Sequence, residues 1–456
     1  MQPVIIKPSE PKCKSAKKVI KLALPVIVVN LLYTVESMFS LVLVSGISPS
    51  AVASVGFSLS LLWFIYSLMA LSYTGTSVLV AQRVGAGEDP SPVLSVGLII
   101  SFLIALPLSF WGRDLVLFLM ELLGASDTVV SLAEDYLKPI FWFITIGFMT
   151  NTFYGAFNGA GDTKTPMKVA VVMNILNISC AYALIYGKFG LPALGVQGAG
   201  WGIVISETVA FLVYLFLTAV KKKPFPLRLG IDSSVVNKFF RIGLPTAVER
   251  AVTTLSFNVF VGFLAHFGDK VLAAHQIGLR VESISFMVGF GFMVASTVIA
   301  GQNYGARNIK GLVYGTYLSA NLTALIMGIA GVILIAFPQH LVLPFSRDEE
   351  VIKWASYYLI IVGISQVPMA YAVIFSGALK GMGRTQVTML LNIVSFWAFR
   401  IVPSYLLLKL FNTPLVPWIF MTVEMFIRAL LFFLAFRREV KRQSFSFSHQ
   451  PAGLSD

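Results

Sequence analysis

The order of apolar and polar residues divides the chain into long apolar stretches separated by short polar segments. A helix needs about 20 mostly apolar residues to cross a membrane. Twelve stretches fit this requirement: residues 19–45, 51–80, 92–112, 132–157, 166–187, 197–220, 238–266, 271–300, 312–337, 352–378, 386–409 and 414–436. They are continuously apolar rather than alternating, which excludes an outer-membrane β-barrel. We therefore predict an all-α integral membrane protein with twelve transmembrane helices.

The composition supports a membrane protein and excludes other classes. Of the 456 residues, 57% are hydrophobic and only 12% are charged, whereas a water-soluble protein carries charge on about 25% of its residues. A soluble enzyme and a disordered chain are therefore excluded. The chain has only two cysteines, which excludes a disulfide scaffold and a cysteine-rich metal cluster.

The net charge of +13 indicates orientation in the membrane. If the N-terminus is cytoplasmic, the two tails and the inner loops hold 22 of the 34 lysines and arginines, and the outer loops hold 7. Cytoplasmic loops of membrane proteins are enriched in these residues. We predict a multi-pass protein of the cytoplasmic (inner) membrane with both termini in the cytoplasm. A nucleic-acid partner is not expected, because no aromatic and basic groove accompanies the charge.

The two halves of the chain repeat each other at a shift of 220 to 222 residues. Three groups of residues match in order: Leu24-Pro25 with Leu244-Pro245; Gln82, Gly85 and Ala86 with Gln302, Gly305 and Ala306; and Gly155, Gly159 and Gly161 with Gly377, Gly381 and Gly383. Because each half has an even number of spans, the second half enters the membrane in the same orientation as the first. This is a parallel repeat about an axis along the membrane normal, with two pseudo-symmetric six-helix bundles enclosing a central cleft.

These features predict five segments. Residues 1–18 form a cytoplasmic N-terminal tail, and residues 19–220 form an N-lobe of helices 1–6. Residues 221–237 are a cytoplasmic linker, residues 238–436 form a C-lobe of helices 7–12, and residues 437–456 are a cytoplasmic tail.

Glu36 is the first candidate for coupling transport to an ion gradient. It lies in the middle of the first span with no basic residue within a turn, and Asn30, Tyr33 and Ser40 lie nearby. Charged groups inside a membrane are costly, so they are usually functional or paired. Glu36 could exchange a proton or bind Na⁺. Glu207 in the sixth span also lacks a partner within a turn of its helix.

The other intramembrane charges lie mainly in the second half. Glu424 and Arg428 are four residues apart, so we expect a structural pair on one helix face. Arg280 and Glu282 are two apart and need different partners, which favours a network between helices. Glu249 and Arg250 are adjacent, so one of them can face the cleft. For Arg400 we expect a position at the outer membrane interface.

Pro25 and Pro245 occupy equivalent positions early in the first helix of each half. A proline lacks an N–H group and loosens the preceding turn, so we interpret these residues as a candidate pair of hinges. The chain has no loop that would cradle phosphate and no defensible metal-ligand spacing. We therefore expect no cofactor and no metal site beyond a possible Na⁺ at Glu36.

Several stretches resemble the signatures of multidrug and toxic compound extrusion (MATE) transporters. The resemblance rests on residues 273–283 and 301–307 in the second half, on residues 53–56 and 82–87 in the first half, and on the two glycine motifs at residues 155–163 and 377–383. It covers residues 15–440. It implies the fold of the wider multidrug, oligosaccharidyl-lipid and polysaccharide flippase superfamily, with export of varied, often cationic, amphipathic drugs in exchange for H⁺ or Na⁺.

The ion-site residues implied by this resemblance are only partly present. The first-helix aspartate of the family corresponds to Ser40, and Glu36 lies one turn earlier. Asn177 matches the fifth-helix asparagine, but its partner position is Ala181. The seventh-helix glutamate corresponds to Thr253, and Glu249 lies one turn earlier. A step of four residues rotates a side chain by about 40° and moves it about 6 Å along the axis, so Glu36 and Glu249 are interpreted as displaced substitutes. Arg280 and Glu282 match the family pattern and are interpreted as network support.

The sequence therefore predicts a monomeric, ion-coupled antiporter that exports small amphipathic molecules by alternating access of its two lobes, in contact with membrane lipids. It is not expected to be an enzyme. One alternative is a flippase for lipids or lipid-linked oligosaccharides, which typically has more spans and a basic cavity. A second alternative is a membrane-embedded enzyme or sensor.

Overall fold

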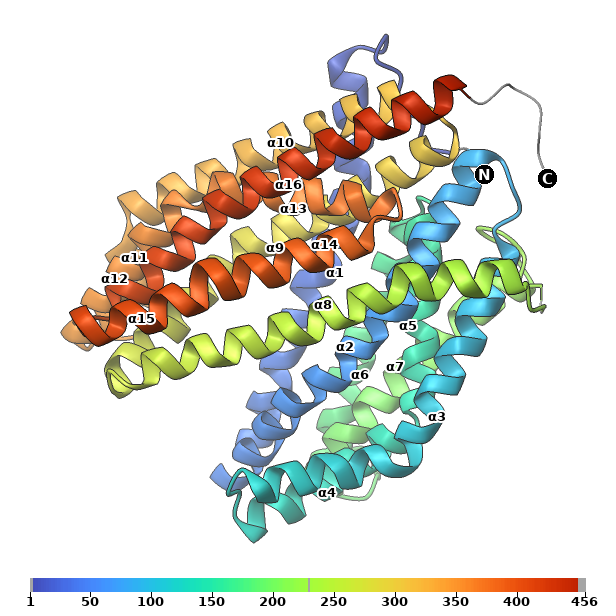
Figure 1. Ribbon diagram of the computed structural model, residues 1–456. Helices are drawn as coiled ribbons and strands as arrows, with labels where there is room; N and C mark the ends of the chain where they lie inside the picture. Colours follow the sequence, from blue (N-terminus) through green and yellow to red (C-terminus); the bar gives the residue numbers. More distant parts are fainter. Residues whose placement is uncertain (1–2, 229, 450–456) are drawn as a thin grey trace. The chain divides into compact units, whose positions relative to one another are not determined.

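The computed structural model describes residues 3–228 and 230–449, and every regular element in these ranges is a helix (Figure 1). The chain divides into two compact units, which are described separately. Unit 1 comprises Val28–Val80 and Asp89–Ala247. Unit 2 comprises Gln2–Ile27, Ala81–Glu88 and Val248–Asp456.

Unit 1 is built from the first half of the chain. Its helices are the second part of α1 (Lys12–Ser45), most of α2 (Pro49–Ala86), α3 (Ser91–Leu122), α4 (Asp127–Trp142), α5 (Ile144–Gly159), α6 (Lys164–Tyr186), α7 (Val196–Ala219) and the first part of α8 (Ser233–Ala265). The core gathers large buried side chains, among them Tyr136, Phe141 and Phe148.

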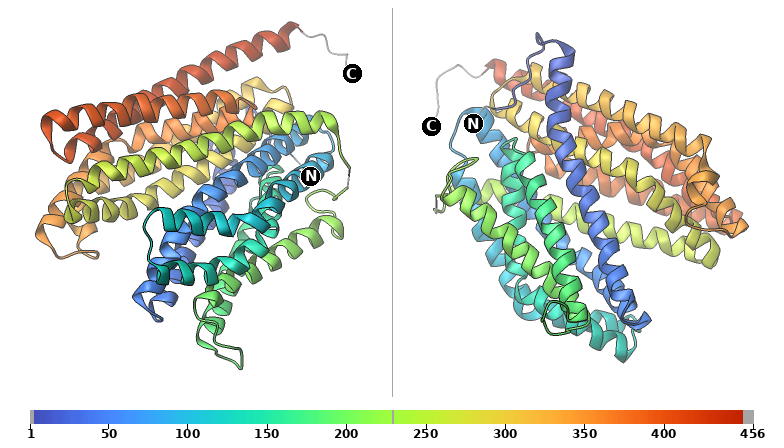
Figure 2. Two further views of the ribbon diagram at one scale, coloured as in Figure 1. Left: turned by 60° about the horizontal axis from the view of Figure 1, so that its bottom comes forward. Right: turned by 180° about the vertical axis from the view of Figure 1, so that it is seen from behind.

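Unit 2 contains the remainder of α8 and the helices that follow. These are α9 (Asp269–Gly305), α10 (Ile309–Ala336), α11 (Pro338–Val342), α12 (Glu349–Ile364), α13 (Gln366–Gly381), α14 (Thr385–Val394), the π-helix η1 (Ser395–Ile401), α15 (Val402–Phe411) and α16 (Leu415–His449). Helices α10, α13 and α16, coloured gold to red, run side by side (Figure 2). Trp418, Tyr358 and Phe260 are fully buried in one of the cores of this unit.

The helices support the predicted number of membrane spans. Among the described residues, ten helices are long and apolar enough to cross a membrane, and two bent helix pairs bring the number to twelve if each pair is one span. The pairs are α4 with α5, bent by 56°, and α12 with α13, bent by 53°.

The two bends correct the prediction of continuous helices at residues 132–157 and 352–378. The first break lies at Phe143, four residues after Pro139, which has no N–H for the carbonyl group one turn earlier. The second break lies at Ser365, and Pro368 follows in the first turn of α13, where a backbone N–H has no helical partner. Each proline therefore favours an interruption.

Close contacts between helices repeat in the two units and support the predicted duplication. A methyl group added at Gly155 of α5 would lie 2.7 Å from the carbonyl oxygen of Tyr73 in α2. In unit 2, a methyl group at Gly377 of α13 would lie 2.6 Å from the carbonyl oxygen of Met293 in α9. Tyr73 and Met293 are equivalent in the repeat, so the same absence of a side chain lets the same helix pair approach closely in both units.

A second glycine contact involves both repeats and lies within unit 2. A methyl group at Gly85 would overlap the backbone carbonyl of Gln302, and one at Gly305 would overlap the backbone carbonyl of Gln82. Each glycine thus packs against the backbone of the opposite repeat. Any larger residue at either position would force the ends of α2 and α9 apart.

Candidate functional site

The first cluster of polar side chains in the membrane helices lies in unit 1 around Glu36. Glu36 is half-buried on α1, and the side-chain amide of the buried Asn177 on α6 donates a hydrogen bond to its carboxylate. Sequence reasoning had singled out both residues without pairing them, since 141 positions separate them. The structure brings them together because α6 faces the second part of α1.

Glu207 on α7 is the second acid of this cluster. Its carboxylate interacts electrostatically with that of Glu36, and Tyr66 of α2 lies within electrostatic range of both acids. The Oε2 atom of Glu207 is buried and has no hydrogen-bond partner within the described residues. Two carboxylates that repel each other away from bulk water favour the uptake of a proton or a cation. We refer to Glu36, Glu207 and Asn177 as the unit 1 acid site.

The other residues predicted around Glu36 lie on the same helix. Asn30 and Ser40 are half-buried on α1, and Tyr33 is exposed but within electrostatic range of Glu207. Ser40 lies one turn beyond Glu36, so the two side chains lie on the same face of α1.

Unit 2 contains a second acid, Glu249 of α8, whose charge is already compensated. The ammonium group of Lys380 on α13 lies 2.8 Å from its Oε1 atom. The side chains of Thr388 and Asn392 on α14 donate hydrogen bonds to the same carboxylate, at 3.0 and 2.9 Å. Glu249 therefore has three partners from two helices, whereas its neighbour Arg250 is exposed. We call this group the Glu249 network.

Sequence reasoning did not identify the partners of Glu249. Lys380 lies within the glycine motif at residues 377–383, whose small residues bring α13 close to α9. The sequence did contain one indication of this partner: Lys380 lies in a motif of small residues, in a chain with few basic residues in its membrane helices. Thr388 and Asn392 are one turn apart on α14, a spacing that places both on one helix face.

Glu282 of α9 forms a third polar group, also in unit 2. The hydroxyl of Tyr358 on α12 donates to its carboxylate at 2.6 Å, and the amide of Gln366, the first residue of α13, donates at 3.3 Å. Ser285 donates to Gln366 in turn, at 2.6 Å. Arg280 is exposed while Glu282 is buried, so the two face different surroundings as expected. The acid thus links α9 to both sides of the break at Ser365.

A fourth group is a buried charged triad in unit 2. Arg400 lies 2.6 Å from Glu424, and Arg428 lies 3.1 Å from the same carboxylate. The pairing of Glu424 with Arg428 agrees with the sequence prediction. The expected interfacial position of Arg400 is wrong, because only 3% of its side chain is exposed. Its guanidinium group lies on the ring of Phe396, which belongs to the same π-helix.

The two candidate hinge prolines are buried within continuous helices. Pro25 lies in α1 and Pro245 in α8. The division between the two units cuts α1 after Ile27 and α8 after Ala247, two residues beyond each proline. The two helices therefore change unit at equivalent positions of the repeat.

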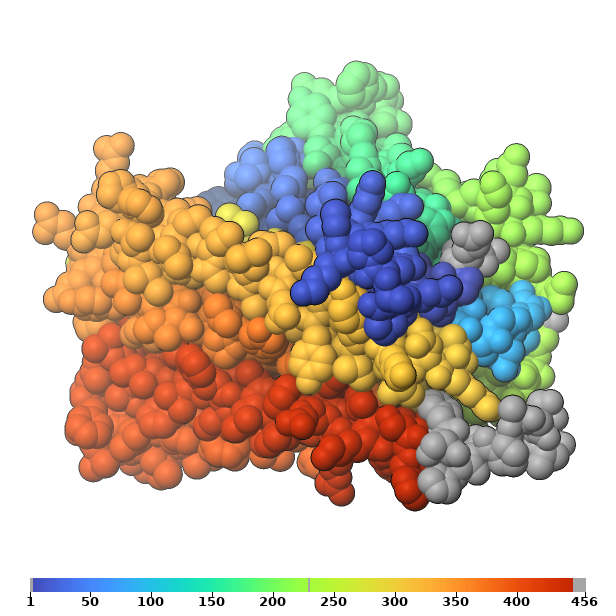
Figure 3. All heavy atoms as spheres, turned by 90° about the horizontal axis from the view of Figure 1, so that it is seen from above, coloured from blue at the N-terminus to red at the C-terminus, as the bar shows by residue number. Residues whose placement is uncertain are grey.

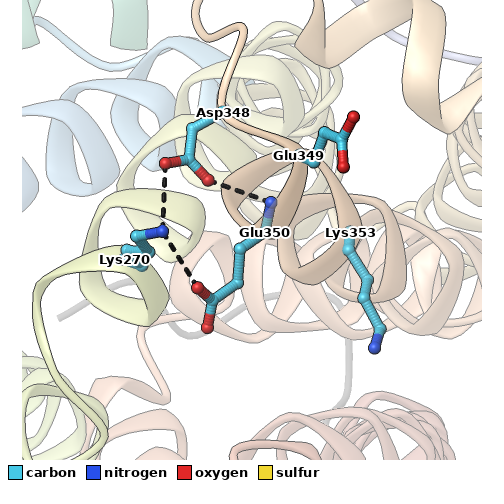
Figure 4. Close-up of a pocket in the computed structure, with 5 residues that line it drawn as sticks. All are labelled: Lys270, Asp348, Glu349, Glu350 and Lys353. Atoms are coloured by element: carbon cyan, nitrogen blue, oxygen red, sulfur yellow. Dashed lines mark hydrogen bonds and ion pairs between the residues drawn. The ribbon is translucent and has the colours of Figure 1, made fainter.

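A charged surface pocket of about 660 Å³ lies at the start of α12 (Figure 4). Lys270 reaches both Asp348 and Glu350, at 3.1 and 3.0 Å, and Glu349 and Lys353 complete the lining. The hydrogen bonds from Val351 and then Lys270 hold the pKa of Asp348 below its usual value. Asp348 also caps α12. These exposed ion pairs fasten α9 to α12 and are distinct from the polar groups in the membrane helices.

Comparison with known proteins adds the family context. The sequence profile of the MatE family matches residues 25–183 and 245–406, two segments that begin 220 residues apart. The chain is 32% identical over 449 residues to the probable multidrug resistance protein NorM of Thermotoga maritima, and the alignment covers 94% of each protein. It is 28% identical over 415 residues to the multidrug resistance protein PmpM of Pseudomonas aeruginosa, covering 85% of this chain and 83% of PmpM.

Solved structures share the fold at lower sequence identity. A crystal structure of MATE in complex with MaL6 superimposes with a TM-score of 0.88 at 20% identity, covering 94% of this chain and 97% of the other. A transporter of the MOP superfamily from Pyrococcus furiosus, described as having a binding pocket of reverse polarity, superimposes with a TM-score of 0.87 at 21% identity, with the same coverage. These similarities establish the arrangement of helices.

Proposed function

This chain belongs to the MatE family of multidrug and toxic compound extrusion transporters, and we propose that it exports amphipathic, often cationic molecules in exchange for inward H⁺ or Na⁺. Its multidrug resistance relatives NorM and PmpM support multidrug efflux. Export proceeds by alternating access of the two lobes. The coupling ion is taken up at the unit 1 acid site.

The observation that carries this proposal is the electrostatic interaction between Glu36 and Glu207 in unit 1, where Glu36 accepts a hydrogen bond from Asn177 and neither acid forms an ion pair with a described lysine or arginine. The mutual repulsion of the two carboxylates is relieved when a proton or a cation binds there. The amide of Asn177 keeps Glu36 oriented in either state. Occupancy of this site therefore changes the charge of unit 1, which is what an ion-coupled transporter requires.

The Glu249 network is assigned a supporting role in the same proposal. Lys380 already neutralises Glu249, and Thr388 and Asn392 donate further hydrogen bonds to its carboxylate. A coupling ion would have to displace the ammonium group first. For this reason we place coupling at Glu36 and Glu207, and treat the Glu249 network as a rigid connection between α8, α13 and α14.

Coupling follows from different affinities in two conformations. An ion that binds one conformation better than the other shifts the population towards it, and a drug that prefers the opposite ionic state is then released or bound. Pro25 and Pro245 are the proposed bending points, because the division of the chain into units follows each of them closely. We further propose that the protein works as a monomer, with both termini in the cytoplasm.

The test is dye efflux from proteoliposomes under separate pH and Na⁺ gradients. The wild-type protein should respond to one of the two gradients, and Glu36→Gln and Glu207→Gln should each abolish that response. Glu121→Gln is the matched control, since Glu121 is an exposed acid at the end of α3. If both variants export as well as the wild type under each gradient, the acid site is not the coupling site.

The same assay separates export from the flippase alternative. A flippase would leave the distribution of every cationic dye unchanged and would instead move labelled lipids between leaflets. Wild-type protein that moves lipid but no dye would therefore overturn the proposed function.

A further inference from the structure

The chain's first described residues lie along the connection between α9 and α10. Residues 4–6 lie outside any helix, and side-chain amides of unit 2 bind their backbone at alternate residues: Val4 N–H donates to Gln302 at 2.5 Å, and Ile6 N–H donates to Asn303 at 3.2 Å. Asn308 donates to the carbonyl of Ile6 at 3.0 Å. Figure 3 shows the dark blue atoms of this part of the chain lying on gold atoms of unit 2. We call residues 302–315 the α9–α10 corner.

The backbone and the side chain of Ile6 each occupy space that a glycine leaves open. Ile6 is completely buried. A methyl group at Gly311 would overlap the carbonyl of Ile6, and one at Gly315 would lie 3.0 Å from the end of the Ile6 side chain. The corner therefore combines amide groups that bind a peptide backbone with a small apolar hole that accepts one aliphatic side chain. These are the elements of a site for an extended peptide.

The same segment is fastened to the first turns of α1. The ammonium group of Lys18 donates to the carbonyl of Ile5 at 2.9 Å and lies 2.8 Å from the carboxylate of Glu10. The ion pair with Lys18 holds the pKa of Glu10 below its usual value. Residues 4–10 thus form a strap with one side on the corner and the other on α1.

We propose that the α9–α10 corner is a binding site for extended peptide and that its occupant is the chain's own residues 4–6. The strap stays docked during transport and anchors the first turns of α1. Gln302 and Asn303 belong to the family signature at residues 301–307, and in this proposal they bind the backbone of the strap. Asn303 is fully buried and its two polar atoms are engaged with the strap and the adjacent helices. The binding part is independent of the proposed function, and the transport part rests on it.

Hydrogen exchange of the full-length protein in detergent tests the binding part. Ile6→Asp places a charge in the apolar hole, and Asn303→Leu removes the amide that pairs with the strap. Each variant should raise the exchange rate of the Val4 and Ile6 amides at least tenfold. Ser9→Asp introduces the same residue three positions away at an exposed site and should leave these rates unchanged. Equal exchange in Ile6→Asp and Ser9→Asp would overturn the binding site.

A reversible disulfide tests whether the strap stays docked. A Cβ atom at Gly315 would lie 3.8 Å from the Cβ of Ile6, within the range of about 3.5–4.5 Å found in disulfides. The variant is Ile6→Cys with Gly315→Cys, with Ile299→Ala to make room, and with Cys13→Ser and Cys180→Ser to remove the other thiols. Dye efflux should be the same within twofold in the oxidised and reduced protein. Loss of efflux on oxidation that reduction restores would show that the strap must leave and would overturn the anchor.

The two proposals fail in distinguishable ways. If wild-type protein exports no dye, the proposed function fails while the exchange experiment still reports on the strap. If dye export is normal and the Val4 and Ile6 amides exchange freely, only the strap proposal fails.

Discussion

The ammonium group of Lys380 lies 2.8 Å from the carboxylate of Glu249, although 131 residues separate them in the chain. Both side chains are nearly buried. Removing one partner of a buried ion pair leaves a charge without compensation, which costs more than removing both.

Lys380→Met should lower the free energy of unfolding by about 3 kcal/mol. The double variant Lys380→Met with Glu249→Gln should recover at least half of that loss, because the amide retains hydrogen bonds to Thr388 and Asn392. Thermal unfolding in detergent measures both. Lys310→Met, at an exposed lysine, is the control. Additive losses in the double variant would mean that the pair does not act as a unit.

Asn177→Ala should reduce ion-driven dye efflux about tenfold, since a hydrogen bond to a charged group is worth about 1.5–3 kcal/mol. Asn174 is the matched control, because it is a buried asparagine one turn earlier on α6 whose amide donates only to the carbonyl of Ala170 in the same helix. Asn174→Ala should retain most of the activity. The orientation of Glu36 by Asn177 would be refuted by equal efflux in the two variants.

Tyr358→Phe should destabilise the protein by about 1–3 kcal/mol, because it leaves one oxygen of the buried Glu282 without its donor. Tyr357 is adjacent in sequence but exposed, and Tyr357→Phe should change stability by less than about 0.5 kcal/mol. Chemical or thermal unfolding measures both variants. A similar effect of the two substitutions would argue against a hydrogen bond of this strength.

Gly305→Ala should destabilise the protein by about 1–3 kcal/mol, since its methyl group would overlap the backbone of Gln82. Gly56, in the interior of α2, has open space around the position of a Cβ atom. Gly56→Ala should therefore stabilise the helix by about 0.5–1 kcal/mol. The unfolding temperature should fall in Gly305→Ala and rise in Gly56→Ala relative to the wild type. Shifts in the same direction would contradict this prediction.

Asp348→Asn should change how stability depends on acidity. The hydrogen bonds from Val351 and Lys270 lower the pKa of Asp348 in the folded protein, while in the unfolded chain it lies at about 3.9. A lowered pKa adds stability that is fully present above the unfolded pKa and is lost as the pH falls through the folded pKa.

The difference in unfolding temperature between the wild type and Asp348→Asn should thus be constant above about pH 5 and shrink below about pH 4. A scan of unfolding temperature against pH measures this difference. The contributions of the other acids cancel, because both proteins contain them. A difference that stays constant down to about pH 3 would contradict the assignment.

The number of helices and the repeat could be predicted because they depend on periodic apolar length and on small residues that recur at one spacing. The bends at Phe143 and Ser365 were missed although Pro139 and Pro368 lie close to them. A proline inside a membrane helix is often accommodated without a large bend, so the presence of a proline does not determine whether the helix breaks. Whether it breaks depends on how the helix packs against its neighbours.

The acids of the candidate site were visible in the sequence, but most of their partners were not. Glu36 and Glu249 stood out because charges are rare in apolar stretches. Asn177, Lys380 and Tyr358 are brought to their acids by contacts between distant helices. Only the pair Glu424 and Arg428, four residues apart on one helix, followed from local spacing. The prediction for Arg400 was wrong, because Glu424 and the ring of Phe396, which spacing did not reveal as partners, hold it in the interior.

The contact of Gly85 with Gln302 and of Gly305 with Gln82 has a consequence for how the chain could be divided. The two glycines are equivalent in the repeat, and so are the two glutamines. Exchanging the two repeats therefore reproduces the same pair of contacts. In homodimers, a two-fold axis produces such self-complementary contacts. One six-helix repeat made as a separate polypeptide would carry both the glycine and the carbonyl group that it faces. The full-length chain is therefore a covalently joined form of what would otherwise be an isologous dimer at this point.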